Sequence, residues 1–214
     1  MSFPPLHIVT DDEVLASPDF LEHAHQLLRT GGERTALHLR GHSTRARTMF
    51  ELALELVRTA RESGALLLVN DRVDVALAAG AGGVQLGRRS LGVLDVRALW
   101  PAAIIGASVH TIDEAAEAEC SGTDFIVLGT IYQTGSHPGY PGAGPVLVRT
   151  VAGAVSVPVV AIGGITSQRA AALVESGAHG MAVKSAIWSA SDPVERMTGL
   201  LAAWKASVAQ GIRT

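Results

Sequence analysis

The sequence predicts a closed (β/α)8 barrel, the TIM-barrel fold, in a single domain over residues 1–214. First, short β-type runs and helical patterns alternate eight times, which indicates parallel strands joined by right-handed crossovers. Second, no linker or change of composition interrupts this alternation. Third, residues 80–87, 122–129 and 177–184 can be aligned in register. Each of them is typical of a glycine helix stop followed by a tight turn and a buried strand.

The first four units are predicted from local patterns. We expect strands at residues 6–10, 36–40, 65–69 and 83–86, and helices at 19–29, 44–63, 73–79 and 93–100. The second strand alternates apolar and polar residues, so His38 and Arg40 share one face. The third strand is apolar throughout, which is typical of a strand buried on both faces. Ser43 or Thr44 is expected to cap the long second helix, and Gly64 to end it.

The last four units follow the same order. Strands are expected at 103–107, 125–128, 157–162 and 181–183, with helices at 111–119, 146–154, 167–176 and within 193–208. The alternative fold, an open doubly wound sheet, normally has a glycine-rich phosphate loop after the first strand. This chain has Thr10, Asp11 and Asp12 there, which favours the barrel.

Composition limits the class of protein. Hydrophobic residues make up 48% and charged residues 17% of the chain, with 23 glycines, as in a globular, turn-rich protein. The net charge of −3 and the lack of a long basic block argue against nucleic-acid or membrane-surface partners. Cys120 is the single cysteine, which excludes an internal disulfide and fits a reducing cytosol. Without a signal-peptide pattern or a membrane-spanning apolar run, we expect a cytoplasmic protein.

Two stretches near the C-terminus predict a phosphate site. Residues 157–166 form a β-branched run that ends in Gly163 and Gly164 before a helix start. Residues 181–185 repeat the arrangement, with Lys184 and Ser185 at the strand end. Glycines let backbone N–H groups approach a ligand, and helix N-termini favour anions. Either stretch alone also fits an ordinary strand-to-helix turn.

Polar residues follow the predicted strands, where barrel enzymes place their chemistry. The candidates are His38, Arg40, His42, Asn70, Asp71, Arg88, Ser90, Ser108, His110, Thr130, Thr134, His137, Gly163, Gly164, Lys184 and Ser185. Several have a structural alternative: Arg40 could pair with a loop carboxylate, Asn70 and Asp71 could cap the next helix, and His110 could be a satisfied loop histidine. His137 lies in the glycine- and proline-rich loop 129–144, which is too long for a plain connection.

The candidates suit proton transfer at an anchored anion. Histidines act as general acids and bases near neutral pH, and a phosphate cup with Arg40 would position an anionic substrate. The chain has no H-E-x-x-H spacing, nucleophile elbow or Walker loop.

Five motifs occur in one family order: residues 37–40 (LHLR), 68–76 (LVNDRVDVA), 83–87 (GVQLG), 108–115 (SVHTIDEA) and 158–166 (PVVAIGGIT). Through them the chain resembles the thiamine-phosphate synthase/TenI superfamily over nearly its whole length. The resemblance implies a (β/α)8 barrel that binds a thiazole phosphate at its mouth, and it makes a homodimer plausible. The superfamily contains two reactions. A synthase joins a pyrimidine pyrophosphate to thiazole phosphate with magnesium, whereas a tautomerase aromatises a carboxythiazole phosphate without metal.

Departures from the synthase pattern favour the tautomerase. The second strand has His38, Arg40 and His42 where synthases have Gln, Arg and Lys, and Ser90 stands where a second magnesium-binding carboxylate follows Asp71. His137 replaces a lysine of the loop after the sixth strand. In the tautomerase branch, a histidine follows the glycine that ends this strand, but here Thr130 does.

We therefore expect a thiazole tautomerase without metal or cofactor. His137 is the first candidate for the proton-moving group, and His110 is the second. Gly163, Gly164, Lys184 and Ser185 would bind the phosphate, and Arg40 or Arg88 the substrate carboxylate. The remaining substrate contacts are assigned to His38, His42, Asn70, Asp71, Ser108, Thr130 and Thr134. The alternatives are a synthase, which would need Mg²⁺, and a non-catalytic regulator that binds a phosphate ligand.

Overall fold

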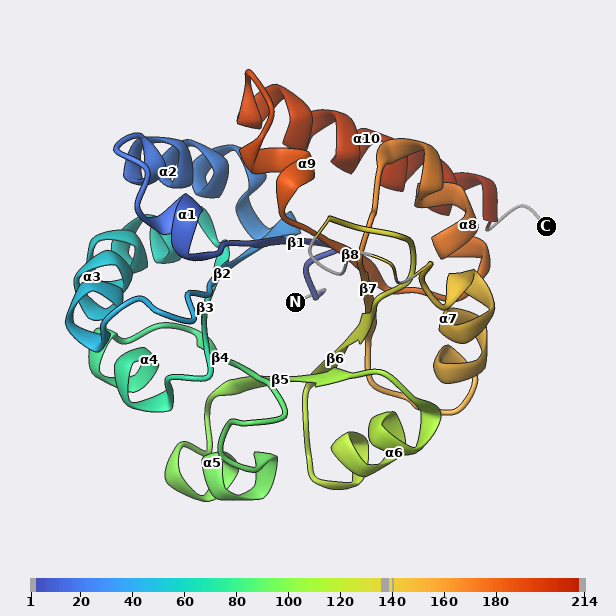
Figure 1. Cartoon of the computed structure of the whole chain (residues 1–214), viewed down its shortest axis with the longest axis horizontal. Helices are drawn as coiled ribbons and strands as arrows, with labels where there is room; N and C mark the ends of the chain where they lie inside the picture. The colour runs from blue at the N-terminus through green and yellow to red at the C-terminus, as the bar shows by residue number, and fades with distance from the viewer. Residues whose placement is uncertain (1–2, 136–138, 140, 212–214) are drawn as a thin grey trace.

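A computed structural model describes residues 3–135, 139 and 141–211 as a closed barrel of eight parallel strands (Figure 1). The strands are β1 (Leu6–Val9), β2 (Thr35–Leu39), β3 (Leu66–Asn70), β4 (Gly83–Leu86), β5 (Ile104–Val109), β6 (Phe125–Gly129), β7 (Val159–Ile162) and β8 (Gly180–Val183). Each strand pairs with its neighbours in sequence, and β8 closes the ring against β1. The predicted fold class is confirmed.

The helices surround this ring (Figure 1). They are α1 (Asp12–Leu15), α2 (Phe20–Gly31), α3 (Ala46–Ser63), α4 (Val73–Ala79), α5 (Val93–Leu99), α6 (Ile112–Cys120), α7 (Gly144–Ala152), α8 (Ala170–Glu175), α9 (Ser185–Trp188) and α10 (Pro193–Gly211), with 3-10 turns at Gly32–Arg34 and Ser167–Arg169. None of the described helices has both the length and the apolar character that crossing a membrane requires.

The start of α3 differs from the prediction. The helix begins after Arg45, which makes no side-chain cap, so neither Ser43 nor Thr44 caps it. Their backbone N–H groups instead donate to the Asp12 carboxylate at 2.9 and 2.8 Å. The predicted stop at Gly64 is confirmed, since this glycine is left-handed with φ 77°.

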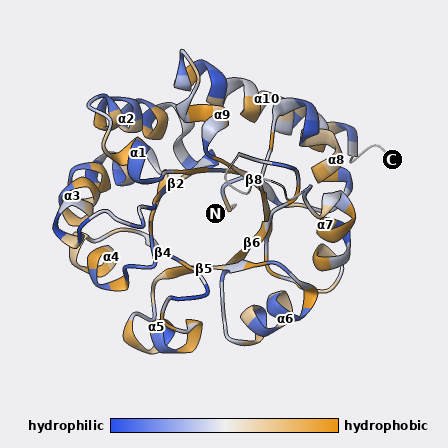
Figure 2. Ribbon diagram, in the orientation of Figure 1, coloured by the Kyte–Doolittle hydropathy of each residue, from blue (hydrophilic) through white to orange (hydrophobic). Residues whose placement is uncertain are grey.

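Two apolar cores hold the barrel together. The larger lies between the strands and the helices and contains Leu28, Leu56 and Val148. The smaller fills the barrel interior with Val9, Leu68, Phe125, Val127, Val160 and Ala182. Much of the strand ring is accordingly apolar, whereas the helices carry both polar and apolar faces (Figure 2). Burial on both sides explains why most strands have continuous apolar sequences.

The N-terminal segment packs across the amino ends of the strands. The Phe3 ring lies 4.6 Å from the Phe125 ring, centroid to centroid, and the Phe3 carbonyl is 2.9 Å from His179 Nε2. The Pro5 carbonyl accepts a hydrogen bond from the Met181 N–H at 2.8 Å. This packing leaves the carboxyl ends of the strands as the side at which a ligand can enter the barrel.

Candidate active site

A cavity of about 740 Å³ opens at the carboxyl ends of the strands. Every candidate site residue that the structure describes, apart from Ser90, lines it: His38, Arg40, His42, Asn70, Asp71, Arg88, Ser108, His110, Thr130, Thr134, Gly163, Gly164, Lys184 and Ser185. Its size is that of a pocket for small organic ligands. His137 lies outside the described residues. The structure thus brings the candidates together, while their individual roles remain predictions.

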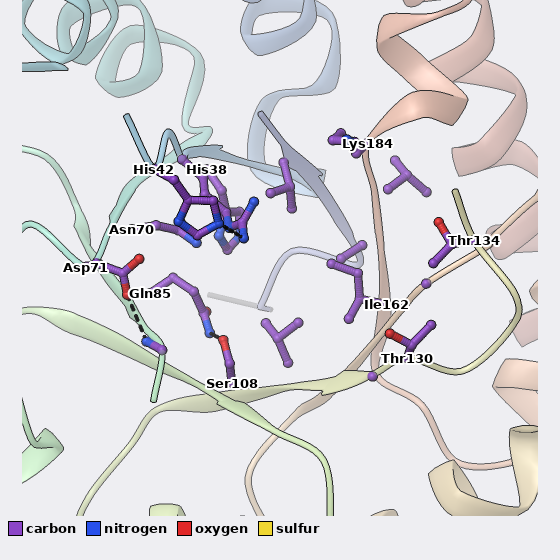
Figure 3. A pocket seen from close by; sticks show the side chains of 18 of the residues that line it. His38, His42, Asn70, Asp71, Gln85, Ser108, Thr130, Thr134, Ile162 and Lys184 are labelled. Atoms are coloured by element: carbon purple, nitrogen blue, oxygen red, sulfur yellow. Dashed lines mark hydrogen bonds between the residues drawn. The ribbon is translucent and has the colours of Figure 1, made fainter. Parts of the chain in front are cut away.

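The floor on the β2–β4 side consists of buried polar side chains. His38 is 1% exposed and Gln85, at the centre of β4, is 2% exposed. Gln85 Nε2 donates to Ser108 Oγ at 3.0 Å, and Figure 3 shows this pair beside Asn70 and His38. Three buried polar atoms have no partner among the described residues: His38 Nδ1, Asn70 Oδ1 and Gln85 Oε1. Buried polar atoms normally have partners, and these three lie in a polar layer beneath the cavity surface, where each exposes less than 1 Å².

Gln85 was not among the predicted site residues. One feature could have identified it: Gln85 is the single amide in the short strand Gly83–Leu86, and all four residues of this strand are buried. An unpaired amide is costly inside a barrel, so such a residue indicates a ligand or a polar network.

The loop after β2 places Arg40 and His42 at the rim. Arg40 donates to His42 Nε2, and the Arg40 N–H donates to Thr10 Oγ1 at 2.8 Å. The Asp12 carboxylate accepts from the His42 N–H at 2.9 Å and from the Thr44 hydroxyl at 2.7 Å. The Thr44 hydroxyl bond outweighs partial burial and, with the backbone N–H groups, lowers the pKa of Asp12. A carboxylate therefore fixes the loop that presents Arg40.

Asp71 contacts the loop after β4. It is left-handed with φ 63°, and its Oδ1 accepts from the Gly87 N–H at 3.0 Å and from the Ser90 hydroxyl. The hypothesis that Asn70 or Asp71 caps the next helix is wrong, because the N-cap of α4 is Arg72 and no side chain caps it. The carboxylate is instead directed to the neighbouring rim loop.

The donor set around Asp71 bears on magnesium. Among the described residues, no group of three or more His, Cys, Asp or Glu side chains could hold a metal ion. Mg²⁺ is commonly bound by one or two carboxylates together with waters and substrate phosphates. Asp71 fits such a shared site, in which a bound pyrophosphate would supply the remaining oxygens, and does not fit one built by the protein alone.

Gly163 and Gly164 shape the opposite side of the cavity. Both have positive φ, 105° and 61°. A Cβ on Gly163 would lie 2.5 Å from Thr130 Cγ2, and one on Gly164 would lie 2.4 Å from the Gln133 carbonyl oxygen. The Tyr132 N–H also donates to the Gly163 carbonyl at 3.0 Å. These glycines therefore allow the loop after β6 to pack on the loop after β7, in addition to shaping the cavity wall.

Lys184 is paired rather than free. Its ammonium group donates to Asp11, the N-cap of α1. Burial raises the pKa of Asp11, but the hydrogen bond from Lys184, the one from the Val14 N–H, and the charges of Lys184 and Arg40 lower it overall. The cation beside the predicted phosphate cup is thus held in place by a carboxylate from the opposite end of the chain.

The loop after β6 completes the rim. Thr130 and Thr134 lie on the same side as Ile162 and Lys184, across the cavity from His42, Asn70 and Asp71 (Figure 3). His110 Nδ1 contacts the Gly129 carbonyl oxygen, which only accepts, so Nδ1 carries the proton in this contact. Thr111 caps α6 by accepting from the Glu114 N–H at 3.1 Å. The remaining ring nitrogen of a neutral His110 is then an acceptor at the cavity.

The charged residues that line the cavity are mainly basic. Five are cationic and one is a carboxylate: Arg40, Arg72, Arg88, Arg89, Lys184 and Asp71. The whole chain has a net charge of −3, so positive charge is concentrated here. Arg72 and Lys184 pair with neighbouring carboxylates, whereas Arg40 and Arg89 have no carboxylate within 4.0 Å in the described part of the chain. The cavity therefore favours an anionic ligand.

Comparison with known proteins agrees with this chemistry. A thiamine-phosphate synthase of Chlorobium luteolum is 40% identical over 201 residues, which cover 93% of this chain and 92% of that protein. One of Desulfitobacterium hafniense is 36% identical over 202 residues, or 94% and 97% of the two chains. The structure of a Pyrococcus furiosus thiamine phosphate pyrophosphorylase superposes with a TM-score of 0.85 at 32% identity, covering 97% and 98%. The family model described as thiamine monophosphate synthase matches residues 6–187, and the chain belongs to this family.

Proposed function

We propose that this protein is a thiamine-phosphate synthase, which joins a pyrimidine pyrophosphate to a thiazole phosphate and releases pyrophosphate. The observation that carries the proposal is the basic cavity at the barrel mouth, where five cationic side chains accompany one carboxylate. The relatives described above bear the name of this activity. The sequence motifs favour the tautomerase and leave the synthase as the alternative, whereas these relatives favour the synthase.

The reaction calls for anion binding more than for proton transfer. The bond between the pyrimidine substrate and its pyrophosphate breaks, and the thiazole ring nitrogen forms the new bond with its own lone pair. Negative charge grows on the departing pyrophosphate, and cations positioned before the reaction stabilise it there. Arg40 has no carboxylate within 4.0 Å in the described chain and lines the cavity, so it is suited to this role.

The two substrates are assigned to opposite sides of the cavity. Gly163, Gly164 and Ser185 bind the thiazole phosphate, with Lys184 beside it, because this side offers backbone at close range. The pyrimidine lies over the buried floor of His38, Asn70, Gln85 and Ser108, and its pyrophosphate reaches Arg40 and the rim arginines. This arrangement positions the reacting groups between the walls.

Magnesium enters through the substrate in this proposal. Asp71 would hold the ion together with the pyrophosphate oxygens, and the ion would neutralise part of the pyrophosphate charge. Arg88 and Arg89 follow Gly87 in the same rim loop, where they add positive charge in the region of the missing second carboxylate. Their guanidinium groups are always charged near neutral pH.

A tautomerase remains the second candidate because of one contact. The pairing of His110 with the Gly129 carbonyl leaves an imidazole nitrogen available as a base at the cavity. A proton transfer on a bound thiazole phosphate needs such a group.

Two assays on the purified full-length protein test the proposal. Pyrophosphate release is measured with both substrates while Mg²⁺ is titrated, and proton exchange into a carboxythiazole phosphate is measured in chelator. The synthase proposal expects Mg²⁺-stimulated pyrophosphate release that requires both substrates. Proton exchange without pyrophosphate release would establish the tautomerase. Binding of thiazole phosphate without either reaction would overturn both and favour a regulator.

A further inference from the structure

An arginine outside the cavity contacts the glycine pair of the predicted phosphate cup. Arg169 ends the 3-10 turn Ser167–Arg169 that follows β7, and it does not line the cavity. Its own N–H closes this turn by donating to the Thr166 carbonyl at 3.1 Å. The side chain then reaches back along the chain, where Nη1 donates to the Gly164 carbonyl. The sequence motifs assign Arg169 no role.

Tyr132, in the loop after β6, contacts the same guanidinium group. The guanidinium carbon of Arg169 lies 4.2 Å from the centroid of the Tyr132 ring, which is a cation–π contact. Both side chains belong to half-buried residues. The Tyr132 N–H also donates to the Gly163 carbonyl at 3.0 Å. The two carbonyls of the glycine pair are therefore both held by groups outside the cavity lining.

The held carbonyls determine where the following N–H groups point. Both peptides are trans, and in a trans peptide the C=O and N–H groups point in opposite directions. The N–H groups of Gly164 and Ile165 therefore lie on the side away from Tyr132 and Arg169, and these two residues line the cavity. Ile165 is 4% exposed, and among the described residues no group accepts from its N–H. Buried N–H groups normally have an acceptor, so this one is available to an anion in the cavity.

We propose that Arg169 is a positioning residue that fixes the peptide between Gly164 and Ile165, so that the N–H groups of these two residues bind the phosphate of the thiazole substrate. Successive N–H groups in turn conformations form anion-binding concavities, and Gly163 and Gly164 have positive φ, 105° and 61°. A charged donor on the carbonyl also polarises the peptide and strengthens its N–H as a donor. The ligand rests on the proposed function, although the phosphate is common to the synthase and tautomerase reactions.

A neighbouring arginine provides a control for charge alone. Arg196, on α10, is exposed and lines a depression together with Ser167, beside the same turn and separate from the cavity. Its replacement removes the same charge from the same region without touching Gly164. A positioning role requires that only the Arg169 variant affect phosphate binding.

Binding of two ligands tests the position of the N–H groups. The probes are the thiazole phosphate and the corresponding thiazole alcohol, which lacks the phosphate, and titration calorimetry measures both. Arg169→Leu should lower the affinity for the phosphate compound about tenfold, the effect of one misplaced hydrogen bond to a charged group, and leave the alcohol unchanged. Arg196→Leu should change neither. An unchanged preference in Arg169→Leu, or an equal loss in Arg196→Leu, would overturn the proposal.

Variants of Tyr132 test the contact that holds the guanidinium group. Tyr132→Leu should reduce the phosphate preference less than Arg169→Leu does, and Tyr132→Phe, which keeps the ring, should retain it. The double variant Tyr132→Leu/Arg169→Leu should lose no more than Arg169→Leu alone, because both residues act through one contact. Arg169→Lys keeps a charged donor and should recover part of the preference. Fully additive losses would contradict the shared contact.

NMR separates this proposal from the synthase proposal. Titration with inorganic phosphate should shift the amide proton signals of Gly164 and Ile165 in the wild type, and should shift them less in Arg169→Leu. Wild-type shifts without pyrophosphate release would contradict the synthase alone. Normal pyrophosphate release with equal shifts in the wild type and Arg169→Leu would contradict the role of Arg169 alone. If Arg169→Leu fails to fold, Arg169→Gln, which is shorter and uncharged, tests the same expectations.

Discussion

The two sides of the cavity are built from different chemical groups. On the β7–β8 side, backbone at Gly163 and Gly164 forms the wall, and the glycines are needed because neighbouring loops approach within contact distance of an added Cβ. On the β2–β4 side, side chains of His38, Asn70 and Gln85 form the floor, and each has a buried atom without a partner in the described part of the chain. Backbone binds a phosphate whatever the reaction, whereas side chains distinguish one ring or leaving group from another. We therefore expect the β2–β4 side to decide which reaction takes place.

Replacing Arg40 with alanine should have the largest effect on activity. We expect this effect to be limited to the substrate on the β2–β4 side of the cavity. We expect kcat/KM for the pyrimidine pyrophosphate to fall about a hundredfold, equivalent to roughly 2.7 kcal/mol, because a charge-assisted contact to the leaving group is lost. Steady-state kinetics with each substrate varied in turn measures this. Arg47→Ala, which removes an exposed arginine paired with Glu51 on α3, is the control. A loss confined to the thiazole phosphate KM would reverse the assignment of the two sides.

Gly164→Ala should damage the opposite side. The new Cβ would lie 2.4 Å from the Gln133 carbonyl oxygen, so the loops must separate. We expect the free energy of unfolding to fall by about 1–3 kcal/mol and the thiazole phosphate KM to rise about tenfold. Chemical denaturation and kinetics measure the two effects. Gly135→Ala, in the loop after β6 that also holds Gln133, has no described atom within 4 Å of its added Cβ and should leave both values unchanged. An unchanged KM in Gly164→Ala would argue against the phosphate cup.

The buried histidines of the β2–β4 side predict an acid-sensitive fold. Unfolded histidines bind protons near pH 6.5, whereas burial lowers the pKa of folded His38 to about 4 and that of His7 well below its usual value. The unfolded state thus binds more protons between these limits. The free energy of unfolding should fall as pH drops from about 6.5 to 4, by up to about 1.4 kcal/mol per pH unit for each histidine.

Urea denaturation across this pH range measures the slope. The double variant His7→Gln/His38→Gln should flatten it, whereas His42→Gln at the rim serves as the control. The titratable groups that face His7 include His38 and His179, so His179→Gln belongs in the same series. An equally steep slope in the double variant would mean that other groups cause the acid sensitivity.

Ser90→Asp should have the smallest effect and concerns magnesium. The Ser90 hydroxyl donates to Asp71, so an aspartate here would place a second carboxylate beside the first. We expect the Mg²⁺ concentration that gives half-maximal activity to fall about fivefold, since carboxylates are preferred Mg²⁺ ligands. Ser90→Asn has nearly the same shape without the charge and should not lower it. An unchanged Mg²⁺ requirement in Ser90→Asp would indicate that the ion binds the substrate away from Asp71.

The family relation also bears on the tautomerase expected from sequence. That expectation depended on departures from the synthase pattern at four positions: His38, His42, Ser90 and His137. Thr130 departs instead from the tautomerase pattern. A different residue type at one of these positions does not show that the site has lost the function of the usual residue, because another side chain can supply it. The arginines at the rim supply positive charge to the cavity. A comparison of single positions with a family pattern does not take this combined charge into account.

The order and type of the strands and main helices followed from local patterns. Apolar β-runs, helix periodicity and glycine stops are properties of neighbouring residues, so Gly64 and the barrel strands could be assigned without tertiary contacts. The gathering of the candidates at one barrel mouth could also be predicted from the sequence, because the carboxyl ends of parallel strands lie on the same side of a barrel. Local patterns failed at the start of α3, where Asp12, 32 residues before Thr44, determines the loop.

Only the tertiary structure decided which groups become the partners of the polar side chains. Lys184 pairs with Asp11 across 173 positions of sequence, and His7 contacts His38 across 31. Closure of the barrel brings such residues together, and no periodicity records which atoms will then face one another. The sequence alone predicts the barrel, its family and the gathering of the candidate residues at the barrel mouth. Proton positions and charge partners depend on packing, because hydrogen bonds and ion pairs form over a few ångströms in space and not along the chain.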